Sequence, residues 1–466
     1  MTEPRYISTR GQAPILGFAD VLLAGLARDG GLYVPESWPQ FTADDIRAMK
    51  DLDYPALAQK VMAPFIGSAI PADDLKKLID DAYATFDAPD VLPLKQLNDT
   101  EYLLELFHGP TLAFKDVAMQ ILGRLFDHVL SERGERITIV GATSGDTGSA
   151  AIEACRDKDA IDIFMLHPKG RVSPVQQAQM TTVEAANVHN IALEGSFDDC
   201  QDRVKDLFND PDFRDRFNLS AVNSINWARV MAQIVYYFWA AVKLGAPDKK
   251  IAFSVPTGNF GNVFAGYAAM QMGLPVSKLI VGSNSNDILA RFFASGTMEM
   301  AGVVPTVSPS MDIQVSSNFE RLLFDLVDRD GAECARVLSD FRKTGKFSVT
   351  DTQLARAREI FAGARFDDDE TKAIIKQVKD ETGELIDTHT AVGVGAARQT
   401  ARETDTPVVI LATAHPAKFP DAVEAASAIR PALPARLADL LDRPQRCQSL
   451  ANDLDQLKRH IEDHLA

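Results

Sequence analysis

Short apolar runs separated by helical segments dominate the chain from about residue 102 onward. The runs are rich in Val, Ile and Leu, as expected for strands that are buried on both faces. They cover residues 102–106, 137–140, 161–166, 188–193, 251–255, 279–281 and 408–412. Strands that alternate with helices predict an α/β fold with parallel sheets flanked by helices.

The first hundred residues follow a different pattern. Apolar residues recur near helical spacing in 18–26, 43–49 and 54–65, which predicts a mainly helical N-terminal region. The tail from Leu433 onward is expected to form solvated surface helices.

Composition narrows the class of protein. A chain of 466 residues, 46% of them hydrophobic, can form two or three domains with large cores. A net charge of −17 repels polyanions and argues against nucleic-acid binding. Residues 251–277 carry no charge, but Pro256 and Pro275 with several glycines argue against a membrane helix. The start lacks a secretory signal, so a cytoplasmic protein is expected, and the histidines and cysteines show no metal-ligand spacing.

Lys115 stands at a position that suits amine chemistry. Gly109 and Pro110 form a turn, and the apolar residues after Lys115 repeat at helical spacing, so Lys115 is expected to begin a helix. The helix dipole and the apolar neighbours Leu112 and Phe114 both lower the cost of an uncharged amine. Schiff-base chemistry needs such an amine. The segment alone also fits a lysine stem that covers apolar surface with its ammonium group in water.

A glycine-rich turn follows run 251–255 and opens a helical stretch. Its residues are Gly258, Asn259, Phe260, Gly261 and Asn262. The glycines let several N–H groups point to one place, and the helix dipole adds positive charge, which together suit a phosphate dianion. The turn has neither the P-loop ending nor the dinucleotide spacing. A tight structural turn explains the same residues equally well.

The turn after run 137–140 is also polar and also opens a helix. Thr143, Ser144 and Thr147 offer hydroxyl and N–H groups that can bind a carboxylate, although the same residue types are ordinary helix caps. Because such turns collect at the carboxyl ends of parallel strands, the two turns are expected to form two walls of one cleft.

Two further sites offer polar groups. Asn223 and Ser224 precede a long helix that carries Arg229 in its first turns, where a cation gains nothing from the dipole and needs an acid or an anionic ligand. Thr413 follows the buried run 408–412, and its hydroxyl is expected to face the same cleft.

Taken together, these motifs resemble the threonine synthase family, in the longer form found in many bacteria and fungi. The matching segments follow the family's order over most of the chain: 30–35, 108–116, 143–148, 167–168, 170–173, 223–229, 256–262, 308–313, 387–393 and 413–419. Thr388 departs from the pattern, because the family has Pro there. The resemblance implies the fold type II of pyridoxal-phosphate enzymes, which is tryptophan synthase beta-like, with an additional N-terminal mainly helical domain.

The expected domains follow from the pattern and the resemblance. Residues 1–100 are expected to form the N-terminal mainly helical domain. Residues 101–130 and 215–466 are expected to form the larger α/β domain that binds pyridoxal phosphate, and residues 131–214 the smaller α/β domain.

The resemblance also implies a reaction and a set of roles. O-phospho-L-homoserine and water become L-threonine and phosphate, the last step of threonine biosynthesis, with pyridoxal 5'-phosphate as cofactor. Lys115 carries the cofactor as an internal aldimine and moves protons at Cα and Cβ. Residues 258–262 hold the cofactor phosphate and Thr413 bonds the pyridine nitrogen. The substrate carboxylate is expected at Thr143, Ser144 and Thr147, and the substrate phosphate at Asn223, Ser224 and Arg229.

Asp146 fits this picture less well. In the broader fold an Asn commonly approaches the phenolic oxygen of the cofactor, and the charge of Asp146 would repel a phenolate unless the carboxyl group were protonated or turned away. Asp146 is therefore expected beside the cofactor, in a state that the sequence does not define.

Other functions use the same residues. A phospho-lyase would eliminate phosphate from phosphohomoserine and release 2-oxobutyrate. A nucleotide-binding oxidoreductase or a non-catalytic binding protein could also be built on glycine-rich turns, and Lys115 would then be dispensable. For the threonine synthase reaction the expected partner is a small-molecule substrate, with the chain as a monomer or homodimer and no nucleic-acid or membrane partner.

Overall fold

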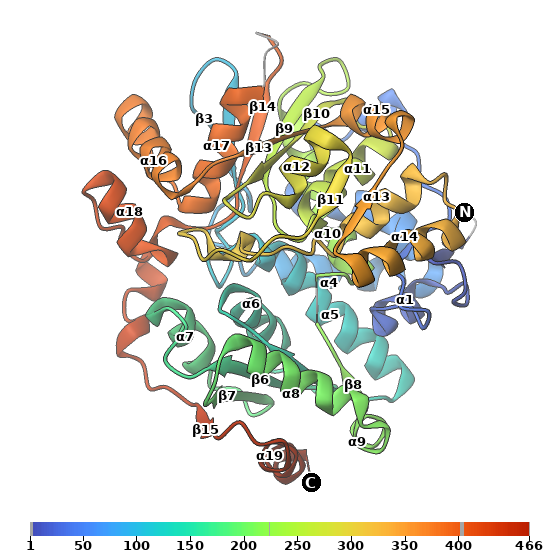
Figure 1. Cartoon of the computed structure of the whole chain (residues 1–466), viewed down its shortest axis with the longest axis vertical. Coiled ribbons are helices and arrows are strands. Elements are labelled where there is room, and N and C mark those ends of the chain that lie inside the picture. The colour runs from blue at the N-terminus through green and yellow to red at the C-terminus, as the bar shows by residue number, and fades with distance from the viewer. Residues whose placement is uncertain (1–2, 223, 401–404, 466) are drawn as a thin grey trace. The chain divides into compact units, whose positions relative to one another are not determined.

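The computed structural model describes residues 3–222, 224–400 and 405–465 (Figure 1). The chain divides into two compact units. The larger unit comprises Met1–His108 and Ser224–Pro431, and the smaller unit comprises Gly109–Asn223 and Ala432–Ala466. Among the helices described, none is both long enough and apolar enough to cross a membrane.

The larger unit, in its described residues, is built on a six-stranded sheet with the order β13-β10-β9-β14-β4-β3. Neighbouring strands are parallel, except that β3 is antiparallel to β4. The strands are β3 (Leu94–Gln96), β4 (Glu101–Glu105), β9 (Ile251–Pro256), β10 (Val276–Ser283), β13 (Phe361–Arg365) and β14 (Val408–Ala412). The apolar runs in this part of the chain therefore form buried strands, as predicted.

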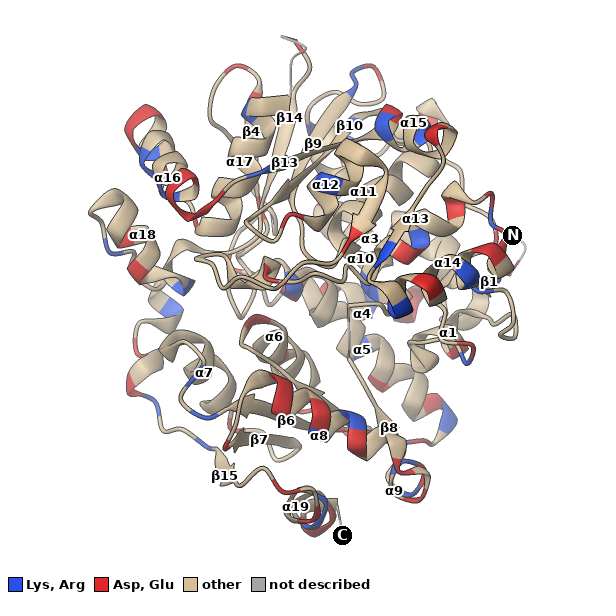
Figure 2. Ribbon diagram, in the orientation of Figure 1, with Lys and Arg blue, Asp and Glu red and all other residues tan. Residues whose placement is uncertain are grey.

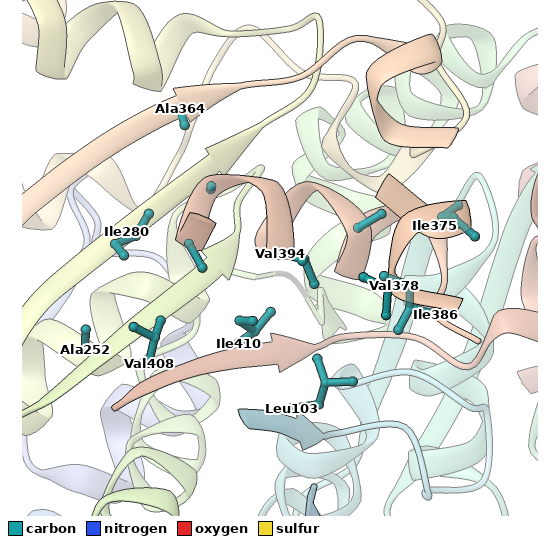
Figure 3. Close-up of a cluster of buried hydrophobic side chains, with 13 residues drawn as sticks. Leu103, Ala252, Ile280, Ala364, Ile375, Val378, Ile386, Val394, Val408 and Ile410 are labelled. Atoms are coloured by element: carbon teal, nitrogen blue, oxygen red, sulfur yellow. The ribbon is translucent and has the colours of Figure 1, made fainter. Parts of the chain in front are cut away.

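Helix α17 (Thr388–Thr400) packs along the sheet against β9, β10, β13 and β14. Val394 of α17, Ile410 of β14 and Ile280 of β10 belong to one buried cluster (Figure 3). Gly393 permits this close approach, because a Cβ there would lie 3.2 Å from side-chain atoms of both Ile410 and Pro256. The sheet is thus fixed from one face by a glycine-containing helix.

The N-terminal part of the larger unit is mainly helical, as predicted. Its elements are β1 (Tyr6–Ser8), α1 (Phe18–Ala24), β2 (Tyr33–Pro35), α2 (Ala43–Arg47), α3 (Tyr54–Ile66), η1 (Gly67–Ala69) and α4 (Ala72–Tyr83). Strands β1 and β2 pair antiparallel. Helix α3 packs on α10 (Trp227–Lys243), of which nearly every residue is buried. Helix α10 in turn packs on α11 (Gly261–Gln271).

The remaining elements of the larger unit are peripheral to the sheet. They are α12 (Ile288–Ser295), β11 (Thr297–Glu299), η2 (Pro309–Met311), α13 (Phe319–Leu326), α14 (Gly331–Thr344), β12 (Lys346–Ser348), α15 (Asp351–Ile360), α16 (Asp368–Thr382), η3 (Pro416–Lys418) and α18 (Pro420–Ser427). Figure 2 shows acidic and basic residues along outer helices such as α14 and α16, whereas β9 and β14 carry none.

The smaller unit has its own parallel sheet, with the order β15-β7-β6-β5-β8 in the described residues. Its elements are α5 (Lys115–Arg133), β5 (Ile137–Ala142), α6 (Asp146–Cys155), β6 (Ile161–Pro168), α7 (Pro174–Thr181), β7 (Val188–Leu193), α8 (Phe197–Asn209), α9 (Pro211–Arg216), β8 (Leu219–Ser220), η4 (Ala435–Leu437), η5 (Leu440–Asp442), β15 (Gln448–Leu450) and α19 (Leu454–Leu465). The expectation that the tail is only solvated helix is wrong in part, because β15 joins the sheet and Leu457 and Ile461 of α19 are buried.

Candidate active site

Lys115 is the first residue of α5, as the sequence predicted. Asp116 fixes the turn before it, because its carboxylate accepts hydrogen bonds from the N–H and the hydroxyl of Thr111 at 2.8 and 2.7 Å. Gly109 makes room for this contact, since a Cβ there would lie 2.5 Å from the Asp116 Cβ. Leu112 has a φ of 61°, a strained conformation for a residue with a branched side chain. Buried contacts therefore define where Lys115 begins its helix.

Asp146 lies beside the amine of Lys115. The Lys115 Nζ is 3.4 Å from the Asp146 Oδ2, and the two side chains are 11% and 6% exposed. The other carboxylate oxygen, Oδ1, accepts a hydrogen bond of 2.8 Å from the Gln176 amide. A Cβ on Gly145, whose φ is 146°, would lie 2.5 Å from the Gln176 amide carbon. Gln176 and the amine thus orient the carboxylate, which in this structure faces Lys115.

The Thr143–Gly148 turn lies in the same unit, at the start of α6. The Thr143 hydroxyl accepts hydrogen bonds from the N–H groups of Gly145 and Gly148 at 3.0 and 2.9 Å, so this residue shapes the turn. Ser144 is exposed and Thr147 is half-buried, and neither hydroxyl bonds to any residue that the structure describes. Both hydroxyls are therefore open to a ligand.

The glycine-rich turn of the larger unit opens α11. Phe260 adopts the left-handed conformation at φ 63°, and among the described residues no side chain caps the helix. A Cβ on Gly258 would lie 2.9 Å from the backbone oxygen of Ser310, so only glycine fits there without a shift. The N–H groups of the first turn of α11 form an anion-binding helix end.

Ser316 and Asn318, which the sequence analysis did not single out, donate hydrogen bonds to carbonyl groups of this turn. The Ser316 hydroxyl donates to the Gly258 carbonyl at 2.6 Å. The Asn318 N–H and side-chain amide both donate to the Asn259 carbonyl, at 3.1 and 3.0 Å. The same amide also lies 3.2 Å from the carbonyl of Ser224. These bonds occupy carbonyl oxygens and so leave donors, not acceptors, at the helix end.

Thr413 lies directly after β14, which is the parallel neighbour of β9. Since parallel neighbours end at one edge of a sheet, Thr413 and the glycine-rich turn share that edge. Thr413 is 5% exposed, and its hydroxyl makes no hydrogen bond with any residue in the described part of the chain.

Comparison with known proteins decides the family. The model for the threonine synthase N terminus matches residues 5–83, the model for pyridoxal-phosphate dependent enzymes matches 90–340, and the model for the threonine synthase C-terminal part matches 390–461. Threonine synthase of Pseudomonas aeruginosa is 57% identical over 461 residues, which cover 99% of this chain and 98% of that protein. The chain belongs to the threonine synthase family.

Solved structures of threonine synthases agree with this result. Threonine synthase from Brucella melitensis with bound pyridoxal phosphate has a TM-score of 0.98 at 54% identity and covers 99% of both chains. The yeast threonine synthase has a TM-score of 0.94 at 40% identity, with 99% of this chain and 98% of that chain covered. The resemblance, the fold type II architecture and the dependence on pyridoxal phosphate are thereby confirmed.

The larger unit of the chain fits a phosphate-bearing cofactor. The Nδ2 of Asn262, in the first turn of α11, is buried and has no hydrogen-bond partner among the described residues. The Nε and Nη1 of Arg229, in the first turn of α10, are also buried and also have no hydrogen-bond partner among the described residues. Buried donors without acceptors are costly, and they gather here near two helix N-termini. Asn223, a predicted neighbour of Arg229, lies outside the described residues.

Arg229 stays charged despite its burial. Desolvation lowers the pKa of its guanidinium to about 10, still well above neutral pH. The Ser224 carbonyl lies 3.8 Å from where a Cβ on Gly261 would stand, so the segment that leads into α10 contacts the glycine-rich turn. The two segments that the sequence analysis assigned to phosphate binding are therefore neighbours in the larger unit.

Segments 308–313 and 387–393 match the family but received no role from the sequence analysis. Together they explain why the Ser310 carbonyl lies so close to Gly258. Asp387 is fully buried and accepts hydrogen bonds from the backbone N–H and the Nδ1 of His389, at 2.8 and 3.0 Å. The Nε2 of His389 then accepts the N–H of Ser310 at 3.3 Å. This chain of bonds places the Ser310 carbonyl against Gly258. Sequence analysis missed the role, although both motifs appeared in the resemblance.

Proposed function

We propose that this enzyme converts O-phospho-L-homoserine and water to L-threonine and inorganic phosphate, as the final step of threonine biosynthesis. The observation that carries the choice of a phosphorylated substrate is Arg229. Its charged guanidinium is buried and has no acidic partner in the described part of the chain. A buried cation of this kind is stabilised by an anionic ligand.

Four groups of residues would hold the cofactor. Lys115 would form the covalent link, and the residues of the glycine-rich turn would bind the phosphate: Gly258, Asn259, Phe260, Gly261 and Asn262. The Thr413 hydroxyl would bond the pyridine nitrogen, and Asp146 would stand beside the linked amine. When bound, pyridoxal phosphate supplies the electron sink that weakens the bonds at the substrate's Cα and Cβ.

The substrate would be held at its two charged ends. Thr143, Ser144 and Thr147 bind the carboxylate through hydroxyl and N–H groups at the start of α6. Arg229, with Ser224 and Asn223, binds the phosphate that leaves in the reaction, and the guanidinium stabilises the charge that the leaving group develops.

Lys115 would act twice. With cofactor and substrate bound, its free Nζ would take the proton from Cα and move protons at Cβ. The Asp146 carboxylate, 3.4 Å from this nitrogen, keeps the amine in place between the two steps.

We further propose that the enzyme works in the cytoplasm as a monomer or homodimer. Its net charge of −17 argues against a nucleic-acid partner.

The test measures all products together. The purified protein, loaded with pyridoxal phosphate, is given O-phospho-L-homoserine, and threonine, 2-oxobutyrate and phosphate are quantified. We expect threonine and phosphate in equal amounts. Release of 2-oxobutyrate instead would assign the phospho-lyase reaction to the same residues.

Lys115→Ala tests the role of the amine. We expect it to lose the visible absorbance of the linked cofactor and to reduce turnover by about 10³-fold or more. Lys205→Ala is the control, because Lys205 is an exposed lysine on α8 of the same unit. A linked cofactor in Lys115→Ala would show that another lysine carries it.

A further inference from the structure

Asn262 is held by two consecutive tyrosines of α10. The Asn262 Oδ1 lies 2.5 Å from the hydroxyl of Tyr236 and 3.0 Å from that of Tyr237. The Tyr237 hydroxyl also lies 2.8 Å from the Asn262 backbone carbonyl, so its one hydrogen is shared between the two Asn262 oxygens. A separation of 2.5 Å is at the short end of the range for a hydroxyl donating to oxygen and is too short for an amide N–H donor. The oxygen of the amide therefore faces the tyrosines.

The tyrosines are themselves fixed. Gln233 donates its Nε2 to the Arg229 carbonyl at 2.9 Å, and its Oε1 lies 3.2 Å from the Tyr236 hydroxyl. The one hydrogen of that hydroxyl goes to the closer acceptor, the Asn262 Oδ1, at 2.5 Å. The Tyr237 ring occupies the space beside Gly266, where a Cβ would lie 2.6 Å from the ring. Gly266 is one helical turn after Asn262, which lets the Tyr237 hydroxyl reach that residue.

This arrangement leaves the NH₂ group of Asn262 without a hydrogen-bond acceptor among the described residues. Asn262 is 7% exposed, and its Nδ2 has no acceptor among the described residues. With the oxygen held by the tyrosines, the NH₂ group lies on the opposite side of the amide, in the first turn of the uncapped helix α11. An acceptor at that helix end would satisfy it, whereas a flipped amide would present its oxygen to an anion and repel it.

We propose that Tyr236 and Tyr237 are positioning residues, which hold the Asn262 amide so that its NH₂ group donates to the phosphate of the cofactor. The inference rests on the proposed role of the glycine-rich turn as the phosphate site. Complete burial raises the pKa of both tyrosines well above the usual value, so their hydroxyls remain donors at every physiological pH.

The experiment compares two cofactor forms that differ only in the phosphate. Apo-protein is titrated with pyridoxal phosphate and with pyridoxal, for the wild type, Tyr236→Phe, Tyr237→Phe and the double variant. We expect each single change to weaken the binding of pyridoxal phosphate by about 3–10-fold and the double change by about 10–100-fold, while the binding of pyridoxal stays the same. The ³¹P resonance of the bound cofactor should shift in the same variants. Tyr54→Phe, on α3 and equally buried, is the control.

Asn262→Ala distinguishes a failure of the tyrosines' positioning role from a failure of the glycine-rich turn as the phosphate site. If the tyrosines act through Asn262, this variant weakens pyridoxal phosphate at least as much as the double tyrosine variant, and adding Tyr236→Phe to it changes nothing further. If Asn262→Ala weakens binding but the tyrosine variants do not, the positioning role is wrong. Equal weakening of pyridoxal and pyridoxal phosphate would also overturn it. If Asn262→Ala leaves the affinity unchanged, the phosphate site itself is misassigned.

Discussion

The Nζ of Lys115 lies 3.4 Å from the Oδ2 of Asp146, while Gln176 holds the other oxygen of that carboxylate. A carboxylate at this distance attracts the amine and holds it in one position at the start of α5. The structure shows this carboxyl group facing the lysine.

Asp146→Asn should slow turnover without removing the linked cofactor. The amide keeps the shape of the side chain but loses the charge that holds the Lys115 amine, so kcat should fall by about 10–100-fold. Visible absorbance after adding pyridoxal phosphate measures cofactor attachment, and threonine release measures kcat. Asp202→Asn, which changes an exposed aspartate on α8, should leave both unchanged. A wild-type kcat in Asp146→Asn would show that the carboxylate does not position the amine.

Gly258→Ala should disrupt the phosphate site by steric clash alone. The new Cβ would stand 2.9 Å from the Ser310 carbonyl and 3.3 Å from the Met311 Cα, which are backbone atoms that move little. We expect about 1–3 kcal/mol of lost unfolding free energy and at least about 10-fold weaker cofactor binding. Gly302→Ala is the matched control, because a Cβ there meets nothing within 4 Å. Denaturant unfolding and titration of apo-protein measure the two effects, and equal behaviour of the two variants would refute the steric account.

Arg229→Met should separate stability from function. Replacing a buried cation that lacks partners removes a desolvation cost, so the unfolding free energy in phosphate-free buffer should rise by about 1–3 kcal/mol. The KM for O-phospho-L-homoserine should rise by about 10–100-fold, because an anion-binding group is lost. Inorganic phosphate should stabilise the wild type but not the variant when both are loaded with pyridoxal phosphate, which occupies the glycine-rich turn. Equal protection of both proteins by phosphate would place the anion elsewhere.

His189 should make the smaller unit less stable in mild acid. Its ring stacks on Phe164 at 4.3 Å and meets His464 edge-on at 4.7 Å. Burial, with help from His464 and His460, lowers the pKa of His189 to about 4. The folded state thus binds fewer protons than the unfolded state, and the stability that is present above about pH 6.5 declines as the pH falls toward 4.

The measurement is urea unfolding at pH 7.5 and pH 5. For His189, which is partly exposed, the loss at pH 5 should be on the order of 1 kcal/mol. His189→Phe keeps a ring on Phe164 and cannot be protonated, so the difference between this variant and the wild type should grow at pH 5. His128→Phe, on α5 of the same unit, should follow the wild type. A constant difference between His189→Phe and the wild type at both pH values would count against the prediction.

The sequence predicted the features that local periodicity encodes. Runs such as 251–255 became strands because each residue is apolar and buried, and Lys115 begins a helix because the apolar spacing starts there. The bond from Ser310 to His389 joins residues 79 positions apart, and polar pairs of that kind leave no period in a sequence. Strand β15 escaped prediction for a related reason. It has three residues, and only its pairing with β7 makes it a strand.

The smaller unit takes its last strand from the end of the chain, which has a consequence for biosynthesis. Gln448 pairs with Ile191, so the edge of β7 stays uncovered until more than half of the chain has been made after it. On the ribosome this edge is a template for pairing with other chains. A protein cut short before Gln448 would carry every proposed active-site residue and still expose that edge. We expect such a product to aggregate or to be bound by chaperones, and therefore to contribute no enzyme activity.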